Sequence, residues 1–241
     1  MHSRLYRYGW KIVDFFFPPR CVGCEKWGDR WCESCINQVT EIKEPICSLC
    51  GDQLPDDTSW NLCERCRQHR PQYAAIRSWA VFEGQVQKAL HALKYERNLG
   101  LGEVMANFLC KVFSSTDWKV DLVVPVPLGM ERFKKRGYNQ AMLLARPFAW
   151  SVGIPHIPKA LQRVRETRSQ VELSILERRE NVAGAFKAIP EIVSGKSVLV
   201  IDDVTTTGST LDACADALRR ANARQVYGLT LARAVRSQKR K

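Results

Sequence analysis

The fold is decided by the stretch Val198-Leu199-Val200-Ile201-Asp202-Asp203-Val204-Thr205-Thr206-Thr207-Gly208-Ser209-Thr210. We expect a buried strand over Ser197 to Ile201 that carries two adjacent carboxylates to its end. A hydroxyl-rich turn follows, and a helix is expected to begin near Leu211. Because ligands of parallel α/β sheets bind at the carboxyl ends of strands, this pattern predicts a binding site.

The chemistry of the stretch suits a phosphorylated ribose. Backbone N–H groups at a helix start, with Thr and Ser hydroxyls beside them, can donate several hydrogen bonds to a phosphate. Carboxylates accept from vicinal sugar hydroxyls, directly or through a divalent cation. Helix capping explains one such residue, but not two adjacent Asp residues ahead of a Thr-rich turn. The expected ribose-phosphate residues are Asp202, Asp203, Thr205, Thr206, Thr207, Gly208, Ser209 and Thr210.

The surrounding sequence alternates between apolar runs and amphipathic segments, which predicts a parallel sheet flanked by helices. Further strands are expected at Ala74 to Phe82, Asp121 to Val126 and Gln225 to Ala232, and helices at Gln85 to Lys94 and Leu101 to Phe113. Pro71 marks the expected boundary between an N-terminal module, residues 1–70, and an α/β domain, residues 71–241.

Composition excludes a disordered chain, because 45% of the 241 residues are hydrophobic. The net charge of +12 arises beyond residue 70, since residues 1–70 hold ten basic and ten acidic side chains. A polyanion-binding surface is therefore expected in the larger domain. The basic, aromatic start from Arg4 to Phe17 ends at Pro18-Pro19 without a cleavage site or a membrane-spanning length, so we expect a soluble, cytoplasmic protein.

Eight of the ten cysteines form four C-x2-C pairs, a spacing typical of four-thiolate zinc sites. Disulfides are the alternative, but they are uncommon in a reducing compartment, and redox-active C-x2-C needs a βαβ context that is lacking here. We expect two structural zinc ions, with consecutive rather than interleaved pairing because it closes shorter loops. The expected ligands are Cys21, Cys24, Cys32, Cys35, Cys47, Cys50, Cys63 and Cys66.

Two other features of the cysteines matter. Eight thiolates and two zinc ions add four net negative charges to a formally neutral module, which argues against nucleic-acid binding there by charge alone. Cys110 and Cys214 stand apart in apolar surroundings, and we interpret both as buried, inert thiols.

A basic stretch lies ahead of the ribose-phosphate segment, with twelve Lys/Arg and five Asp/Glu over residues 131–187. Charges with interleaved rings such as Phe133 suit single-stranded nucleic acid, although a solvated loop with a packed ring explains any single residue equally well. The arginines could alternatively close over a pyrophosphate. The residues expected to contact pyrophosphate or DNA are Arg132, Lys134, Lys135, Arg136, Tyr138, Arg163, Arg165 and Arg168.

The segment from Val198 to Thr210 resembles the signature of type I phosphoribosyltransferases, in which the acidic pair contacts the ribose hydroxyls and the hydroxyl-rich loop holds the 5-phosphate. Several further motifs, in order, resemble the ComF family, also called competence protein F. These are His91-Ala92-Leu93-Lys94-Tyr95, Val124-Pro125-Val126-Pro127-Leu128, Arg132 to Gln140, and Arg163 to Gln170 with Arg178, Asn181 and Gly184-Ala185-Phe186.

The resemblance implies a phosphoribosyltransferase-like domain behind a double zinc ribbon and a role in DNA uptake. It implies as partners single-stranded DNA, a DNA-translocating ATPase, other single-strand-handling proteins, and phosphoribosyl pyrophosphate with Mg²⁺ or a nucleotide. One hypothesis is a DNA-handling protein whose pocket binds ribose phosphate. Another is an active phosphoribosyltransferase with a nitrogen acceptor, and a third is a sensor of phosphoribosyl pyrophosphate. The sequence assigns no catalytic residue.

Overall fold

The computed structural model describes residues 14, 18–56, 59–166 and 175–234, with no side chains at 175, 176, 178 and 179. Arg168 and the segment from Arg4 to Phe17, except Asp14, lie outside the described residues. Among the described residues, no helix has both the length and the apolar character needed to cross a bilayer.

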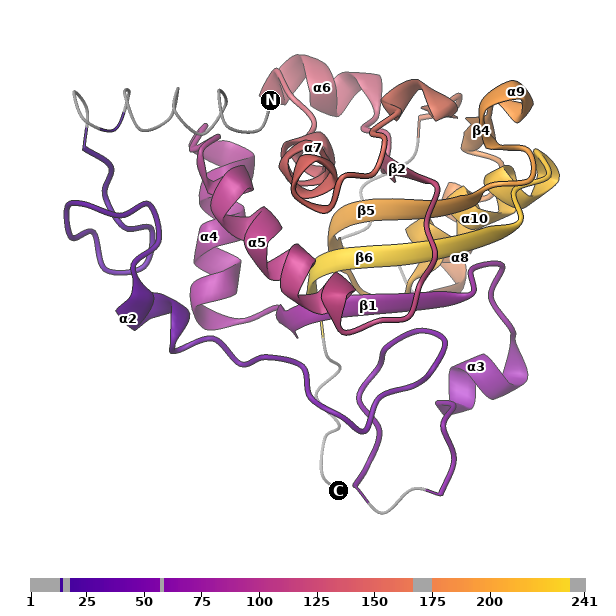
Figure 1. Ribbon diagram of the computed structural model, residues 1–241, viewed down its shortest axis with the longest axis horizontal. Coiled ribbons are helices and arrows are strands. Elements are labelled where there is room, and N and C mark those ends of the chain that lie inside the picture. Colours follow the sequence, from indigo (N-terminus) through magenta and orange to yellow (C-terminus); the bar gives the residue numbers. More distant parts are fainter. Residues whose placement is uncertain (1–13, 15–17, 57–58, 167–174, 235–241) are drawn as a thin grey trace.

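A four-stranded parallel sheet forms the centre of the molecule, in the order β1-β6-β5-β2 (Figure 1). The predicted fold class is confirmed. The strands are mostly apolar, as expected for a parallel sheet that is covered on both faces. The strands are β1 (Ala75–Val81), β2 (Leu122–Pro125), β5 (Ser197–Thr205) and β6 (Gln225–Arg233).

The predicted end of β5 was wrong. We expected the strand to stop at Ile201, but its backbone remains paired with β6 as far as Thr205 opposite Arg233. Asp202 and Asp203 therefore lie inside the strand, and the following helix, α10 (Ser209–Arg220), begins two residues earlier than Leu211.

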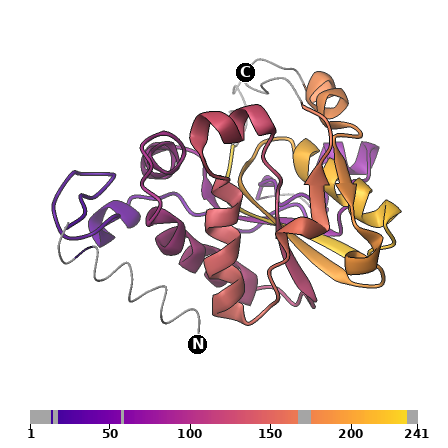
Figure 2. The same cartoon turned by 90° about the horizontal axis from the view of Figure 1, so that it is seen from above.

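Helices cover the sheet on both faces (Figure 2). The side chains buried beneath them form two hydrophobic cores. Side chains alternate across each strand, so Val123 and Leu199 enter one core while Leu122 and Val124 enter the other. We call them the α5 core and the α10 core. The α5 core is covered by α4 (Gly84–Tyr95), α5 (Leu101–Ser114) and α7 (Gln140–Val152).

The α10 core is covered by α10 and by a small antiparallel β3–β4 sheet with its neighbouring short helices. These elements are β3 (Leu161–Arg163), α8 (Ile175–Val182), β4 (Phe186–Ala188) and α9 (Pro190–Val193), preceded by the 3₁₀ turn η1 (Pro158–Ala160). Cys214 is buried in this core as predicted, and burial raises the pKa of its thiol. Cys110 is only half-buried, so full burial was wrong for this thiol.

The N-terminal cysteines form two clusters, each beside a short helix, α2 (Glu33–Ile36) or α3 (Glu64–Gln68). We call Cys21, Cys24, Cys32 and Cys35 the first cluster, and Cys47, Cys50, Cys63 and Cys66 the second cluster. Cysteines of the first cluster pack into the α5 core, and cysteines of the second into the α10 core. The two clusters therefore pack against opposite faces of the same sheet.

An aromatic group anchors the first cluster. Trp31 meets Trp79 of β1 and Phe108 of α5 edge-on, with ring centroids 5.9 and 5.8 Å away. Arg30 adds a 3.1 Å hydrogen bond to the side chain of Asn98, between α4 and α5.

Backbone contacts anchor the second cluster. The Ile76 N–H of β1 donates to the Leu49 carbonyl at 2.6 Å. At Gly51, φ is +69°, and a Cβ atom would lie 2.6 Å from the Ile76 carbonyl oxygen. Only glycine allows this close approach of the two chain segments.

Candidate functional site

The two carboxylates of β5 are buried and have different surroundings. Asp203 forms an ion pair with Lys94 of α4, and its Oδ1 accepts from the Gln140 side chain of α7 at 3.1 Å. Asp202 accepts instead from the backbone N–H of Asp203, at 2.9 Å. Successive residues of a strand point to opposite faces, which explains the division.

These surroundings shift the two carboxyl pKa values in opposite directions. Burial raises the pKa of Asp202 well above its ordinary value, and the charge of Asp203 raises it further. Burial also opposes ionisation of Asp203, but the ammonium of Lys94 and hydrogen bonds outweigh burial and lower its pKa. The pair therefore favours one negative charge, on Asp203, balanced by Lys94.

The hydroxyl-rich turn joins β5 to α10. Gly208 has φ +81° at the start of α10, a conformation that favours glycine. The Thr207 and Ser209 hydroxyl oxygens are 2.7 Å apart, and the Ser209 N–H donates to Thr207 Oγ1 at 3.3 Å. Thr205 is buried at the end of β5, so the open part of the turn begins at Thr206.

A cleft of about 490 Å³ opens at the acidic pair. It lies between the segment after β2, helix α6 (Met130–Arg136) and the elements around β3. Its charged and polar lining consists of Lys94, Tyr95, Glu131, Arg132, Arg136, Gln140, Arg163, Glu166, Asp202, Asp203 and Thr210. Buried carboxylates thus face a partly basic rim, an arrangement suited to a sugar that carries phosphate groups.

The basic residues predicted from sequence are divided by the structure. Arg132, Arg136 and Arg163 line the cleft. Lys134 and Lys135 are exposed on α6 and do not line it. The Tyr138 hydroxyl donates to the Leu93 carbonyl, and Arg165 donates to the carbonyls of Asn181 and Ala183 at 3.0 and 2.6 Å.

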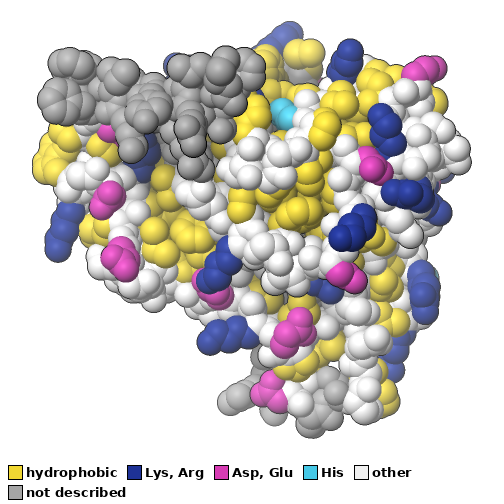
Figure 3. Space-filling view, in the orientation of Figure 1, with side chains coloured by type: hydrophobic (Ala, Val, Ile, Leu, Met, Phe, Trp, Pro, Cys, Tyr) yellow, Lys and Arg dark blue, Asp and Glu magenta, His cyan; other side chains and the backbone are white. Residues whose placement is uncertain are grey.

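One exposed aromatic side chain lines the cleft, and a second lies on α6 outside the lining. Tyr95 is 63% exposed, and the Arg136 guanidinium lies 5.3 Å from its ring centre. Phe133 is 45% exposed, so it is not a packed ring. Figure 3 shows basic and acidic side chains interspersed over the face that it draws.

The cysteines meet the requirements of two zinc sites, and the predicted consecutive grouping is confirmed. The Sγ atoms within each cluster lie within 4.8 Å of one another. A tetrahedron with Zn–S bonds of about 2.3 Å places sulfurs roughly 3.8 Å apart. The separations are 3.4 Å for Cys21 and Cys32 and 3.6 Å for Cys50 and Cys63. Zinc held here is structural, because thiolates fill all four positions.

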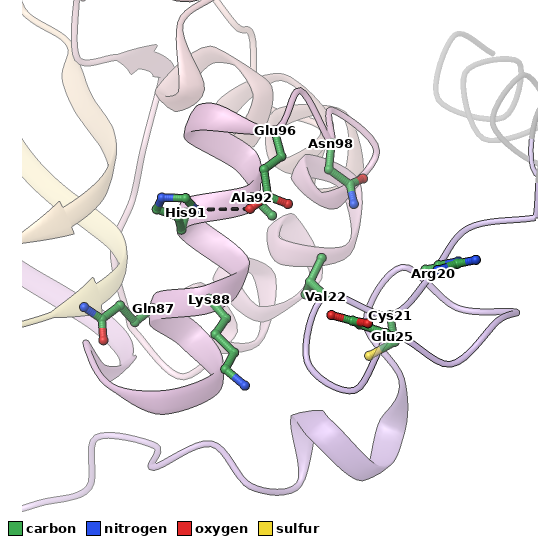
Figure 4. A pocket seen from close by; sticks show the side chains of 10 residues that line it. All are labelled: Arg20, Cys21, Val22, Glu25, Gln87, Lys88, His91, Ala92, Glu96 and Asn98. Atoms are coloured by element: carbon green, nitrogen blue, oxygen red, sulfur yellow. Dashed lines mark hydrogen bonds and ion pairs between the residues drawn. The ribbon is translucent and has the colours of Figure 1, made fainter.

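The two clusters border hollows of different size. About 570 Å³ is open between the first cluster and α4, with Arg20, Glu25, Lys88 and Glu96 among its lining residues (Figure 4). Only about 100 Å³ is open between the second cluster and the turn at Thr207, Gly208 and Ser209.

Sequence reasoning missed three residues and one element. Lys94 and Gln140 were noticed only as parts of motifs, and Arg233 was not noticed. The β3–β4 sheet, which edges the cleft, was not identified because its three-residue strands give no periodic signal. The place of Lys94 next to the buried apolar residues of α4 was a further sign of its role.

The sheet, the acidic strand end and the two cysteine clusters define a phosphoribosyltransferase-like protein with a zinc-binding N-terminal part. Residues 12–67 match the double zinc ribbon domain family, and residues 92–241 match the phosphoribosyl transferase domain family. The chain belongs to the competence protein F (ComF) family, which joins these two domains.

Similar proteins span nearly the whole chain. The DNA utilization protein YhgH of Salmonella typhimurium is 32% identical over 213 residues, covering 86% of this chain and 91% of that protein. Competence protein F of Haemophilus influenzae is 28% identical over 230 residues, covering 91% and 99%. Competence protein ComFC of Bacillus subtilis is 28% identical over 217 residues, covering 85% of each.

Proposed function

We propose that this protein acts in the uptake or use of DNA in the cytoplasm, binding single-stranded DNA along the cleft rim and a phosphorylated ribose at the acidic pair. The cleft carries the proposal, because it combines buried carboxylates, three arginines and Thr210 from the first turn of α10. The preceding part of the turn, Thr207, Gly208 and Ser209, borders the smaller hollow instead. Arginines neutralise phosphates, and exposed rings such as Tyr95 can stack on unpaired bases. The names of the relatives support the DNA role.

We assign the sugar hydroxyls to the acidic pair and the 5-phosphate to the turn from Thr206 to Thr210. Asp203 is an acceptor fixed by Lys94 and Gln140, so it is already oriented before a ligand arrives. Lys94 occupies the place of a cation at this carboxylate. The acidic pair is therefore not a good direct magnesium site, and Mg²⁺ would arrive on the pyrophosphate oxygens of phosphoribosyl pyrophosphate.

A second function is transfer of ribose 5-phosphate to a nitrogen acceptor. The elements around β3 favour it, because they enclose the cleft beside the acidic pair and leave room for an acceptor. In that reaction a C–N bond forms at the anomeric carbon, pyrophosphate leaves with the electrons of its C–O bond, and the nitrogen loses a proton to the released pyrophosphate or to solvent water.

Two measurements on the zinc-loaded protein distinguish these functions. The first is affinity for single-stranded DNA across salt concentrations, where a steep loss of affinity with salt is expected. The second is pyrophosphate release from phosphoribosyl pyrophosphate with ammonia and nucleobases as acceptors. Release that disappears in Asp203→Asn would establish the transferase. Absence of both DNA and ribose 5-phosphate binding would refute the proposal.

A further inference from the structure

Arg233 links the second cysteine cluster to the phosphate-binding turn. It is the last residue of β6, and its side chain is fully buried. One guanidinium nitrogen donates to the Cys50 carbonyl in the second cluster. The other donates to the Thr206 carbonyl in the turn at 3.5 Å. A single buried charge therefore contacts both the segment from Cys47 to Cys50, which we call the knuckle, and the turn after β5.

The environment of Arg233 depends on the second cluster. A zinc ion with four thiolates carries a net charge of about −2. Asp52, which follows the knuckle, lies 3.8 Å from the Arg233 guanidinium. Because a buried charge is costly unless it is paired and hydrogen-bonded, Arg233 requires this knuckle to stay in place. Its Nε atom already lacks a hydrogen-bond partner among the described residues, so losing a further hydrogen bond would be costly for this buried charge.

The same knuckle contacts the turn through a second route. Tyr73, buried between the two, has its hydroxyl 3.1 Å from the position that a Cβ at Gly208 would occupy. Arg65, on α3, donates to the Cys50 sulfur at 3.5 Å and lines the small hollow beside Thr207. Movement of the second cluster would therefore reach the turn at both Thr206 and Gly208.

We infer that the second zinc centre is a working part of the ribose-phosphate site, with Arg233 as the positioning residue that couples metal and ligand. The inference rests on the proposed function, since it requires a ribose phosphate at the turn. Coupling between two binding sites is reciprocal. If zinc in the second cluster raises the affinity for the ligand, the ligand must raise the affinity of that cluster for zinc by the same factor. The first cluster has no contact of this kind among the described residues and should be uncoupled.

The test measures zinc transfer from the full-length, zinc-loaded protein to a coloured chelator, with and without saturating ribose 5-phosphate. Two kinetic phases are expected, and Cys24→Ser, which lacks a ligand of the first cluster, identifies the phase of the second. Ribose 5-phosphate should slow the second-cluster phase about fivefold or more and leave the other unchanged, because the ligand stabilises the folded arrangement that has to open before zinc leaves the second cluster. An equilibrium competition with the same chelator should show a matching gain in zinc affinity.

Two arginine variants locate the coupling. Arg233→Lys keeps the charge but cannot reach two carbonyls with one planar fork, so it should bind both zinc ions and lose most of the protection. Arg30→Met is the matched control, because Arg30 joins the first cluster to the α4–α5 connection and should leave the protection intact.

Each outcome is decisive. Ribose 5-phosphate that binds but slows both phases equally, or neither, overturns the inference and leaves the proposed ligand in place. Protection that persists in Arg233→Lys overturns the role of Arg233. Failure of the wild-type protein to bind ribose 5-phosphate overturns the proposed pocket and this inference together. The wild-type measurement needs no variant, so it can refute the inference even if the Arg233→Lys protein does not fold.

Discussion

The first and second cysteine clusters offer the same four thiolates, but they join the rest of the protein differently. Cys24 of the first cluster is exposed, and a hollow of about 570 Å³ lies beside this cluster. Cys47 and Cys50 of the second are fully buried, with about 100 Å³ open towards the turn. Two sets of four thiolates can therefore have different roles: the first cluster fastens the N-terminal module to the α5 core, and we infer that the second cluster supports a ligand site.

The largest expected effect comes from removing one ligand of each cluster. Cys47→Ser should abolish folding, because a structural zinc site can contribute about 10 kcal/mol or more, comparable to the stability of a whole domain. Cys24→Ser should fold with one zinc and a lower melting temperature. Zinc content and thermal unfolding followed by circular dichroism measure both. Similar melting temperatures for the two variants would contradict the expectation that folding depends more strongly on the second cluster than on the first.

A large but local effect is expected at the anchor of the first cluster. Trp31→Ala removes a buried ring packed on Trp79 and Phe108, which should lower the free energy of unfolding by about 3–5 kcal/mol. Affinity for ribose 5-phosphate, measured by calorimetry below the melting transition, should not change. A marked loss of affinity would show that the first cluster also supports the pocket.

A comparable change in stability is expected at the acidic pair, with opposite signs for Asp202 and Asp203. Asp203→Asn leaves Lys94 without its buried partner and should cost about 3 kcal/mol of stability. Asp202→Asn should stabilise the unliganded protein at neutral pH and weaken ribose binding. Urea unfolding of both variants provides the comparison, and destabilisation by Asp202→Asn at pH 7 would contradict it.

The pH dependence of Asp202→Asn follows from the raised pKa of Asp202. A group with a raised folded-state pKa contributes stability below its unfolded pKa, about 3.9 for Asp, and loses that contribution as pH rises through the folded value. The advantage of the neutral Asn should therefore grow from about pH 4 upward. An advantage that stays constant with pH would indicate that packing, and not charge, is responsible.

The smallest expected effect lies outside both clusters. Charge reversal of Lys134 and Lys135 on α6 should weaken single-stranded DNA binding and reduce the salt slope by about 0.7 for each DNA phosphate that is no longer neutralised. Lys119 is exposed just before β2, at the opposite end of that strand from α6, and Lys119→Glu is the matched control for the single reversal Lys135→Glu. Equal weakening in both proteins would indicate a general charge effect, and unchanged binding after reversal at α6 would place the DNA surface elsewhere.

Sequence patterns predicted the elements of the sheet because buried strands and amphipathic helices leave local periodic signals. β1 and α5 lie within one residue of their predicted ends. The pattern failed where tertiary pairing decides the outcome, as at β5, which continues through two aspartates only because β6 lies alongside. Lys94 and Arg233 matter because of contacts with Asp203 and Cys50, which are more than 100 residues away in sequence. No local sequence pattern reveals such contacts.

The strand order has a consequence for the biosynthesis of the protein. β6, the last of the described strands in chain order, lies between β1 and β5, and it carries Arg233, which contacts the second cluster. The cysteines of that cluster emerge long before β6 exists, and parallel pairing over such separations forms slowly. The side of the second cluster that Arg233 covers in the folded protein therefore stays open to solvent until β6 has been made.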